Sequence, residues 1–298
     1  MSKYILFLKD ITVKDVPLVG GKTASLGEMY SHLQQEGVPV PNGFAITAEA
    51  YKYFLAYNHL EIPVSDILKT IDPKKVTDLE KKSKKIRDLI FGGVMPDDLA
   101  KDISKAYGDL STFSKTTNLD VAVRSSATAE DLPNASFAGQ QESYLNVKGE
   151  KDLLIAVKNC FASLYTSRAI SYRADKGFTS MAVYLSAVVQ KMVRSDKGGA
   201  GIMFTLDTET GFKDIVVLSA VWGLGETAVQ GQVVGDEYEI FKPTFLAGHP
   251  AIINRTLGSK NKKLIYDPKK LGAVTRIATS KEEQKQFVLK DEEVLQLT

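Results

Sequence analysis

The chain has 298 residues, of which 44% are hydrophobic and 25% are charged, a balance typical of globular proteins that excludes disordered and collagen-like chains. Its net charge of +2 gives no electrostatic basis for nucleic-acid binding, and no apolar run approaches the ~20 residues of a membrane-spanning helix. The first ten residues carry only a short apolar stretch, unlike a signal peptide, and one cysteine excludes an internal disulfide, so we expect a cytoplasmic protein.

The first part of the chain carries helical patterns. Residues 23–36 are predicted to form a helix, with an apolar face made by Leu26, Met29, Tyr30 and Leu33. Residues 38–47 contain two prolines and a glycine and predict a turn into a strand, after which a helix runs to about Asn58. Residues 72–105 are predicted to be helical, with breaks at Gly92-Gly93 and Pro96.

The second part of the chain is richer in strand signals. A short strand is predicted at 121–124, and residues 151–175 predict one amphipathic helix with Cys160 in its buried face. Four short β-branched segments follow, at 182–193, 200–206, 214–221 and 237–241. Helices followed by strands indicate the α+β class, with a helix-rich subdomain over 1–194 and a strand-rich one over 195–298.

Gly20-Gly21-Lys22-Thr23 is similar to the end of a phosphate-binding P-loop. The motif requires a glycine five positions before Gly21, where this chain has Val16, so a P-loop is excluded. Backbone N–H groups at the start of the following helix can still face an anion, and Lys22 adds a positive charge. The alternative is an ordinary glycine turn with an exposed lysine.

Residues 223–228, GLGETA, match one form of the dinucleotide-binding fingerprint after a predicted strand. No acidic residue for a ribose follows at the usual distance, and Gly231 would interrupt the helix that the motif requires. A tight turn that lets another chain segment or a phosphate approach closely is therefore the favoured interpretation.

The segment 121–147, VAVRSSATAEDLPNASFAGQQESYLNV, is dense in small and hydroxyl-bearing residues. Arg124 could bind a phosphate in bidentate geometry, and Gly139 could let backbone N–H groups close over a polyanion. A loop of this length is typical of either a functional or a disordered segment. The alternative is a surface loop with a solvated arginine.

Taken together, these segments resemble a known family. DVPLVGGKTASLGEM, the segment 121–147, CFASLYTSRAISYR, VVQKMVRSDKGGAGIMFTLDTETGF and WGLGETAVQG occur in this order. They resemble the N-terminal nucleotide-binding domain of the phosphoenolpyruvate synthase (pyruvate, water dikinase) family, nearly end to end. The resemblance implies an ATP-grasp-like fold, in which two subdomains clamp ATP, and it implies ATP and Mg²⁺ as cofactors.

The family's activity implies the roles of several residues. Its members pass the β-phosphoryl group of ATP to a histidine on a swivelling domain, and a third domain then converts pyruvate to phosphoenolpyruvate, leaving AMP and phosphate. Lys22 and Arg124 would contact the phosphates and support catalysis. Gly139 and Ser143 would belong to the loop over the triphosphate.

The resemblance also places residues near the base of the nucleotide. Gln190, Met192 and Val193 would lie on the hinge strand near adenine, and Glu226 would lie in a turn of the same site. The family's magnesium-binding Glu and Gln lie downstream of the matched segments, so we assign no metal ligand in this chain. The final residues, DEEVLQLT, begin a helix that has no C-terminal stop, so we expect an inactive fragment that lacks its partner domains.

Two alternatives remain open at this point. The chain could be the ATP domain of a rifampicin phosphotransferase or another dikinase, since these share the SSATAED-type and SFAGQ-type segments. It could also be a non-catalytic interaction module that binds no nucleotide, although the presence of Lys22 and Arg124 argues against this.

Overall fold

The computed structural model describes residues 2–128, 142–175, 183–267, 269–270 and 273–298. The chain divides into two compact units, Met1–Met192 and Val193–Thr298, each described by itself below. Both units combine helices with antiparallel sheets, so the predicted α+β class is confirmed. Across the described residues, no helix is long and apolar enough to cross a membrane.

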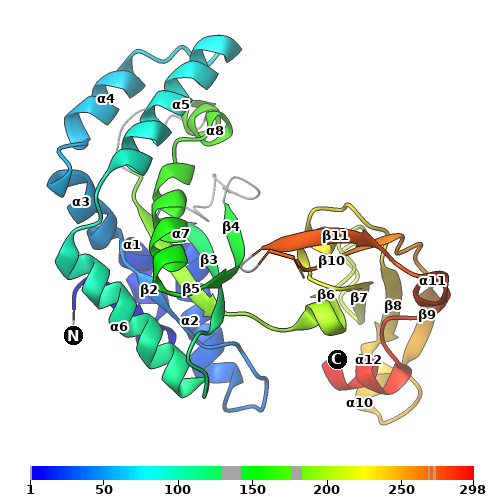
Figure 1. The fold of residues 1–298 in the computed structure, drawn as a ribbon. Helices are drawn as coiled ribbons and strands as arrows, with labels where there is room; N and C mark the ends of the chain where they lie inside the picture. The colour runs from blue at the N-terminus through cyan, green and yellow to red at the C-terminus, as the bar shows by residue number, and fades with distance from the viewer. Residues whose placement is uncertain (1, 129–141, 176–182, 268, 271–272) are drawn as a thin grey trace. The chain divides into compact units, whose positions relative to one another are not determined.

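A five-stranded sheet forms the centre of the first unit. Its strands, in spatial order, are β1 (Ile5–Phe7), β2 (Gly43–Ile46), β5 (Leu185–Lys191), β3 (Asp120–Ala127) and β4 (Ser143–Lys148), with every neighbouring pair antiparallel (Figure 1). The strand predicted at 121–124 is therefore longer than expected, and β4 was not predicted. Because β3 and β4 occupy both ends of the segment 121–147, less of that segment is loop than its composition indicates.

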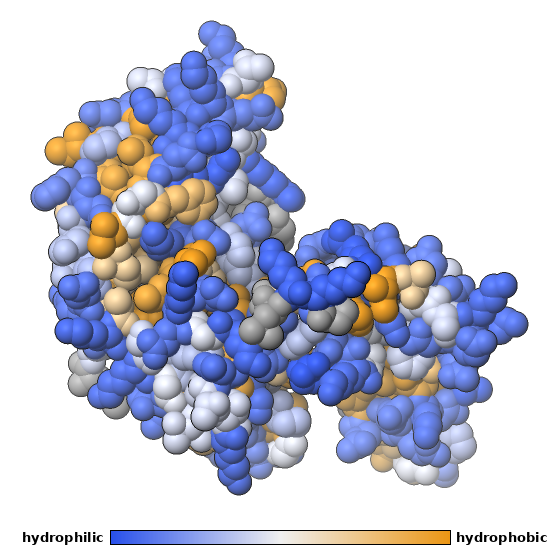
Figure 2. All heavy atoms as spheres, in the orientation of Figure 1, coloured by the Kyte–Doolittle hydropathy of each residue, from blue (hydrophilic) through white to orange (hydrophobic). Residues whose placement is uncertain are grey.

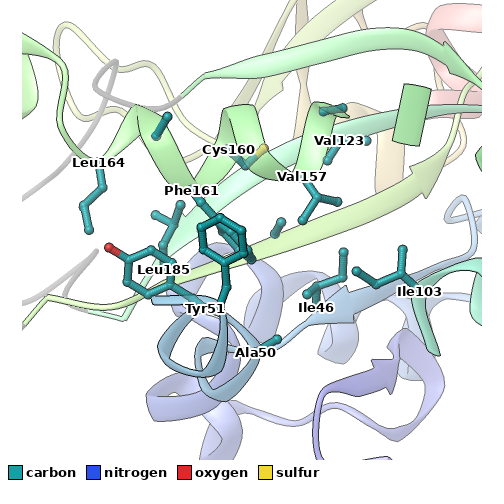
Figure 3. Close-up of a cluster of buried hydrophobic side chains, with 14 of the residues drawn as sticks. Ile46, Ala50, Tyr51, Ile103, Val123, Val157, Cys160, Phe161, Leu164 and Leu185 are labelled. Atoms are coloured by element: carbon teal, nitrogen blue, oxygen red, sulfur yellow. The ribbon is translucent and has the colours of Figure 1, made fainter. Parts of the chain in front are cut away.

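Helices cover the first face of this sheet. They are α3 (Ala48–Tyr57), α4 (Glu61–Lys69), α5 (Val76–Gly92), α6 (Asp97–Phe113), α7 (Glu150–Ser163) and α8 (Ser167–Asp175). Their apolar faces join the sheet in the larger core, where Phe161 of α7 packs on Tyr51 of α3 and Cys160 of α7 is also buried (Figure 3). The predicted buried position of Cys160 and the helix breaks near Gly92 and Pro96 are confirmed.

The predicted helix 151–175 is in fact two helices, α7 and α8. The chain turns between them, and the Thr166 hydroxyl accepts the backbone N–H of Ala169 at 3.2 Å, which starts the second helix. The carbonyl of Tyr165 in this turn accepts the buried Ser83 hydroxyl of α5 at 2.8 Å. These contacts with a cap and with a neighbouring helix outweigh the continuous apolar pattern.

The second face of the sheet carries a smaller core. It is covered by η1 (Leu8–Asp10), η2 (Val13–Asp15), α1 (Val16–Val19) and α2 (Gly21–Leu33). Leu8, Ile11, Val19 and Ala24 from this layer pack on Ala45 of β2 and Val188 of β5. This layer places the start of α2 against the sheet.

The predicted apolar face of α2 is confirmed for Leu26 and Tyr30, which pack against the smaller core, and wrong for Met29 and Leu33. Met29 and Leu33 are 49% and 38% exposed, and the buried positions of the helix are instead Gly21, Thr23, Ala24 and Gly27. A Cβ atom on Gly27 would lie 2.6 Å from the carbonyl oxygen of Ile11, so the helix backbone packs too closely for larger residues. Close packing of small residues, rather than burial of large ones, orients this helix.

The second unit is built on a four-stranded antiparallel sheet in the order β6 (Gly199–Phe204), β7 (Ile215–Trp222), β8 (Asp236–Phe241) and β9 (Ile252–Thr256). A separate hairpin pairs β10 (Lys262–Tyr266) with β11 (Val274–Ala278). The remaining elements are η3 (Ser195–Lys197), α9 (Glu226–Val229), α10 (Lys242–Leu246), α11 (Lys281–Lys285) and α12 (Asp291–Leu297). The strands predicted at 200–206, 214–221 and 237–241 are confirmed, whereas β9, β10 and β11 were not predicted.

The core of the second unit combines apolar residues with one buried ion pair. Leu218 of β7 and Tyr238 of β8 pack with Val294 of α12. Lys260 and Asp236, both fully buried, form an ion pair. Hydrophilic side chains cover most of the surface of this unit that is visible in Figure 2, with smaller hydrophobic areas between them.

Candidate functional site

The register of the first sheet decides which face carries Arg124. Arg124 on β3 is the direct partner of Val188 on β5, and Val188 belongs to the smaller core under α2. Its neighbours Val121 and Val123 belong to the larger core. Since partners in an antiparallel pair point to the same face, Arg124 lies on the α2 face of the sheet.

Lys22 reaches the same face from α2. It is the second residue of that helix and is exposed, whereas Gly21 and Thr23 on either side are buried. The backbone N–H of Thr23 donates to the hydroxyl of Ser126 on β3 at 3.3 Å. Because Ser126 lies two positions after Arg124 on that strand, the start of α2 is fastened to the strand that carries the arginine.

Ser143 lies on β4, the strand that pairs with β3 along the edge away from β5. Ser143 and Arg124 are direct partners in the β3–β4 pair, and Ser143 is exposed. The ladder continues beyond them, since the backbone N–H of Ser125 donates to the carbonyl of Glu142 at 3.2 Å. The structure therefore brings Lys22, Arg124 and Ser143 to one region of the sheet, while Gly139 lies outside the described residues.

Of the residues predicted to lie near adenine, Gln190 belongs to the end of β5, and Met192 and Val193 follow that strand. Gln190 pairs with Ala122 on β3 and with Gly43 on β2, and its side-chain amide nitrogen donates to the carbonyl of Pro41 at 3.0 Å. The backbone N–H of Met192 donates to the carbonyl of Asp120 at 3.0 Å, and Val193 is exposed. Gln190 is thus largely buried and holds the segment before β2, whereas Met192 is half-buried and Val193 is exposed.

Glu226 belongs to the other unit, at the start of α9. Its carboxylate accepts a hydrogen bond from the Gln230 side chain at 2.8 Å. The preceding turn has a structural explanation, because a Cβ atom on Gly223 would lie 2.5 Å from the carbonyl oxygen of Leu264 in β10. The close approach expected of this turn is therefore made by β10, and the four residues of α9 are too few for a dinucleotide-binding helix.

Sequence reasoning missed a group of buried hydroxyls beneath the start of α2. Ser126 and Ser186 are direct partners on β3 and β5, and both are fully buried together with Thr23. Within the described part of the chain, the hydroxyls of Thr23 and Ser186 have no hydrogen-bond partner. The signal in the sequence was the hydroxyl-rich run that follows Arg124, but the sheet register was needed to show which of its hydroxyls meets α2.

The electrostatics of this region favour an anion. It combines two cationic side chains, Lys22 and Arg124, with the N-terminus of a 13-residue helix, whose dipole adds partial positive charge. No group of three His, Cys, Asp or Glu side chains converges on a metal site among the residues that the structure describes. Burial raises the pKa of the Cys160 thiol well above its usual range, so this thiol stays protonated and is no nucleophile.

Comparisons with known proteins identify the family of this chain. Residues 16–298 match the protein family described as pyruvate phosphate dikinase, AMP/ATP-binding domain. Three phosphoenolpyruvate synthases are similar: that of Aquifex aeolicus is 52% identical over 98% of this chain and 34% of its own length. Those of Helicobacter pylori and Escherichia coli are 51% and 46% identical, over 98% and 99% of this chain and 36% and 37% of their own lengths. The chain thus spans about a third of the length of these relatives.

Proposed function

Because the chain belongs to the pyruvate phosphate dikinase AMP/ATP-binding domain family, we propose that it is the ATP-binding, phosphoryl-donating domain of a phosphoenolpyruvate synthase. In this function the β-phosphoryl group of ATP passes to a histidine on another domain of the same polypeptide. That phosphohistidine then converts pyruvate to phosphoenolpyruvate, with AMP and phosphate as the other products. The observation that supports this most strongly is the placement of Lys22 and Arg124 on one face of the sheet, beside the start of α2.

The chemistry suits these two side chains. Phosphoryl transfer requires positioning and charge neutralisation more than covalent participation of the protein. Arg124 offers a rigid fork of donors that matches phosphate oxygens, while Lys22 offers a compact positive charge. Ser143, opposite Arg124, and Gly139 would complete the phosphate side of the site as the loop over the triphosphate.

We further propose that the two units are the two subdomains of an ATP-grasp-like clamp. Met192 and Val193, which follow β5 where one unit gives way to the other, are then the residues near adenine. Gln190 belongs to the same hinge strand, and its side-chain amide also holds the segment before β2 through its bond to Pro41. Glu226 is then a residue of the second subdomain that contacts the nucleotide, and its carboxylate is held by the Gln230 side chain.

Mg²⁺ is implied by the family, and the described residues offer no cluster of three or more acidic side chains for it. Magnesium prefers carboxylate oxygens, and the face that carries Lys22 and Arg124 presents cations, with no group of acidic side chains converging there among the described residues. We therefore assign no ligand of Mg²⁺ to this chain and derive no step through it. Since ATP and pyruvate are soluble metabolites, we place the enzyme in the cytoplasm.

The acceptor histidine is also expected outside this chain. His32 is exposed on α2 and contacts Glu28 at 3.1 Å, while His59 follows the end of α3 and His249 follows α10. None of the three has the setting of the family's phosphorylated histidine. The chain alone should therefore bind ATP without keeping its phosphoryl group.

Labelled nucleotide tests this function directly. In a full-length polypeptide that carries this domain, label from the β-phosphate of ATP should appear on a histidine and then in phosphoenolpyruvate once pyruvate is added. Label from the γ-phosphate should appear as inorganic phosphate. Transfer to rifampicin in place of pyruvate would favour the rifampicin phosphotransferase alternative, and absence of any ATP-dependent rise in melting temperature would favour a module that binds no nucleotide.

A further inference from the structure

Ser126 connects the two elements that carry the cations of the site. It lies on β3, two positions after Arg124, and is fully buried. Its hydroxyl accepts the backbone N–H of Thr23, the residue that directly follows Lys22. The loop before Lys22 also meets Ser126, because a Cβ atom on Gly20 would lie 2.3 Å from its oxygen.

We propose that Ser126 is a positioning residue that sets the spacing between Lys22 and Arg124, so that both cations contact the same polyphosphate. This inference rests on the proposed function. A strand and a helix are rigid, so one contact between them fixes the separation of the side chains next to it. Without this contact, the start of α2 would keep its apolar packing on the sheet but lose its hydrogen bond to β3, so Lys22 would be held less closely relative to Arg124.

A neighbouring hydroxyl, that of Ser186, provides a control for the contact made by Ser126. Ser186 faces Ser126 on the adjacent strand and is equally buried, but its hydroxyl has no hydrogen-bond partner within the described residues. Removal of the Ser126 oxygen would leave the buried N–H of Thr23 without its acceptor. Removal of the Ser186 oxygen would leave no described donor unpaired, so Ser186→Ala is a matched control for Ser126→Ala.

Two measurements on the purified chain test the proposal. Hydrogen–deuterium exchange reports on the amide of Thr23, and NMR titration gives Kd for ATP, tripolyphosphate and adenosine even where binding is weak. Ser126→Ala should speed exchange at Thr23 and weaken ATP and tripolyphosphate binding about tenfold, the effect of one lost hydrogen bond. Adenosine binding should not change, whereas a general loss of structure would weaken all three ligands.

Control variants separate the possible outcomes. Ser186→Ala should match the wild type in both measurements, and Ser126→Cys, which keeps the size and a weak acceptor, should fall between the wild type and Ser126→Ala. Unchanged Thr23 exchange in Ser126→Ala would overturn the positioning role, as would equal polyphosphate binding by Ser126→Ala and Ser186→Ala. A wild-type chain that binds neither ATP nor tripolyphosphate would instead overturn the proposed function, and this inference with it.

Discussion

Arg124 on β3 and Val188 on β5 are direct partners in the antiparallel sheet, which turns Arg124 toward α2 and away from the larger core. Lys22 lies on the same face, because the next residue, Thr23, donates its backbone N–H to Ser126 on β3. Two cations from distant parts of the sequence therefore meet beside one helix N-terminus. Positive charges placed in this way suit the phosphoryl transfer proposed for the chain.

Removal of either cation should slow phosphoryl transfer. In a full-length polypeptide carrying this domain, Lys22→Ala and Arg124→Ala should each lower the rate about 10²–10³-fold, the usual effect of losing one contact to the charge that develops in the transition state. Arg124→Lys should restore only part of the rate, because lysine lacks the planar fork of donors. Steady-state turnover measures this, and near wild-type turnover of Arg124→Ala would contradict the assignment.

Gly20 should not tolerate a side chain. Its φ of 77° is unfavourable for other residues, and a Cβ atom would also lie 2.8 Å from the carbonyl oxygen of Ala127, which cannot move aside as a side chain could. We expect Gly20→Ala to lower the free energy of unfolding by about 2–4 kcal/mol, measured by urea denaturation.

A second glycine, Gly37, separates the cost of the positive φ from the cost of the steric clash. Gly37 has a similar φ of 83°, but a Cβ atom there would meet nothing within 4 Å. Gly37→Ala should therefore show the backbone cost alone, about 1 kcal/mol. Equal effects of the two substitutions would mean that the approach to Ser126 and Ala127 is not tight.

The sequence predicted those features that depend on local pattern. The buried position of Cys160 on α7 followed from helical periodicity, and the break between α5 and α6 followed from Gly92, Gly93 and Pro96. Lys22 and Arg124 were candidates because they adjoin glycine-rich and hydroxyl-rich segments. In each case the deciding residues lie close together in the sequence.

Features that depend on contacts between distant segments could not be predicted. The buried face of α2 is set by the approach of Gly27 to Ile11, so the apolar pattern of Met29 and Leu33 was misleading. The role of Ser126 depends on the register of β3 and on where α2 begins. For the same reason, no local pattern indicates that β10 is the segment that approaches the turn at Gly223.

The buried ion pair in the second unit should be essential for its stability. Asp236 contacts Lys260 and also accepts the backbone N–H groups of Gly258 at 2.8 Å and Val288 at 2.7 Å. Lys260→Met leaves a buried carboxylate without its counter-charge, which should cost about 3–5 kcal/mol in urea denaturation.

Two controls distinguish this effect from a general loss of charge. Lys84→Met removes an exposed ion pair with Asp88 on α5 and should leave stability nearly unchanged. The double variant Asp236→Asn/Lys260→Met should lose less than the sum of its single variants, because it leaves no buried charge unpaired. Additive losses would show that the pair contributes no specific interaction.

Stability should fall at alkaline pH. Burial raises the pKa values of Tyr51 and Tyr165, whose hydroxyls lie 2.6 Å apart in the larger core, and burial also raises that of Cys160. In the unfolded chain these groups lose protons near pH 8.5 for cysteine and near pH 10 for tyrosine. Above those values the unfolded state binds fewer protons than the native state, so the free energy of unfolding decreases as pH rises.

Denaturation curves between pH 7 and pH 11 measure this dependence. Tyr51→Phe removes one of the groups whose pKa is raised, so its stability should fall less steeply above pH 9 than that of the wild type. Tyr57→Phe, which alters an exposed ring, should keep the wild-type slope. An equal slope for Tyr51→Phe would mean that Tyr51 ionises as readily in the native state as in the unfolded chain.

The sheet of the second unit has an edge strand with exposed apolar side chains. β6 is an edge strand of its sheet, and a groove of about 290 Å³ lies against it, lined by Ile202 and by Leu289 and Leu297. Met203 and Phe204 on the same strand are 43% and 46% exposed. An open edge with apolar side chains favours pairing with a further segment, and the relatives are about three times as long as this chain.

We therefore expect this chain to bind MgATP more weakly than a full-length polypeptide that carries the same domain, and to transfer no phosphate alone. The described residues supply cations for the phosphates but no group of carboxylates for magnesium, so part of the charge on the nucleotide stays uncompensated. Calorimetric titration of MgATP into both proteins measures the difference, with magnesium-free ATP as the control. Comparable MgATP affinities would contradict an incomplete site, and phosphohistidine on this chain alone would contradict an acceptor on another domain.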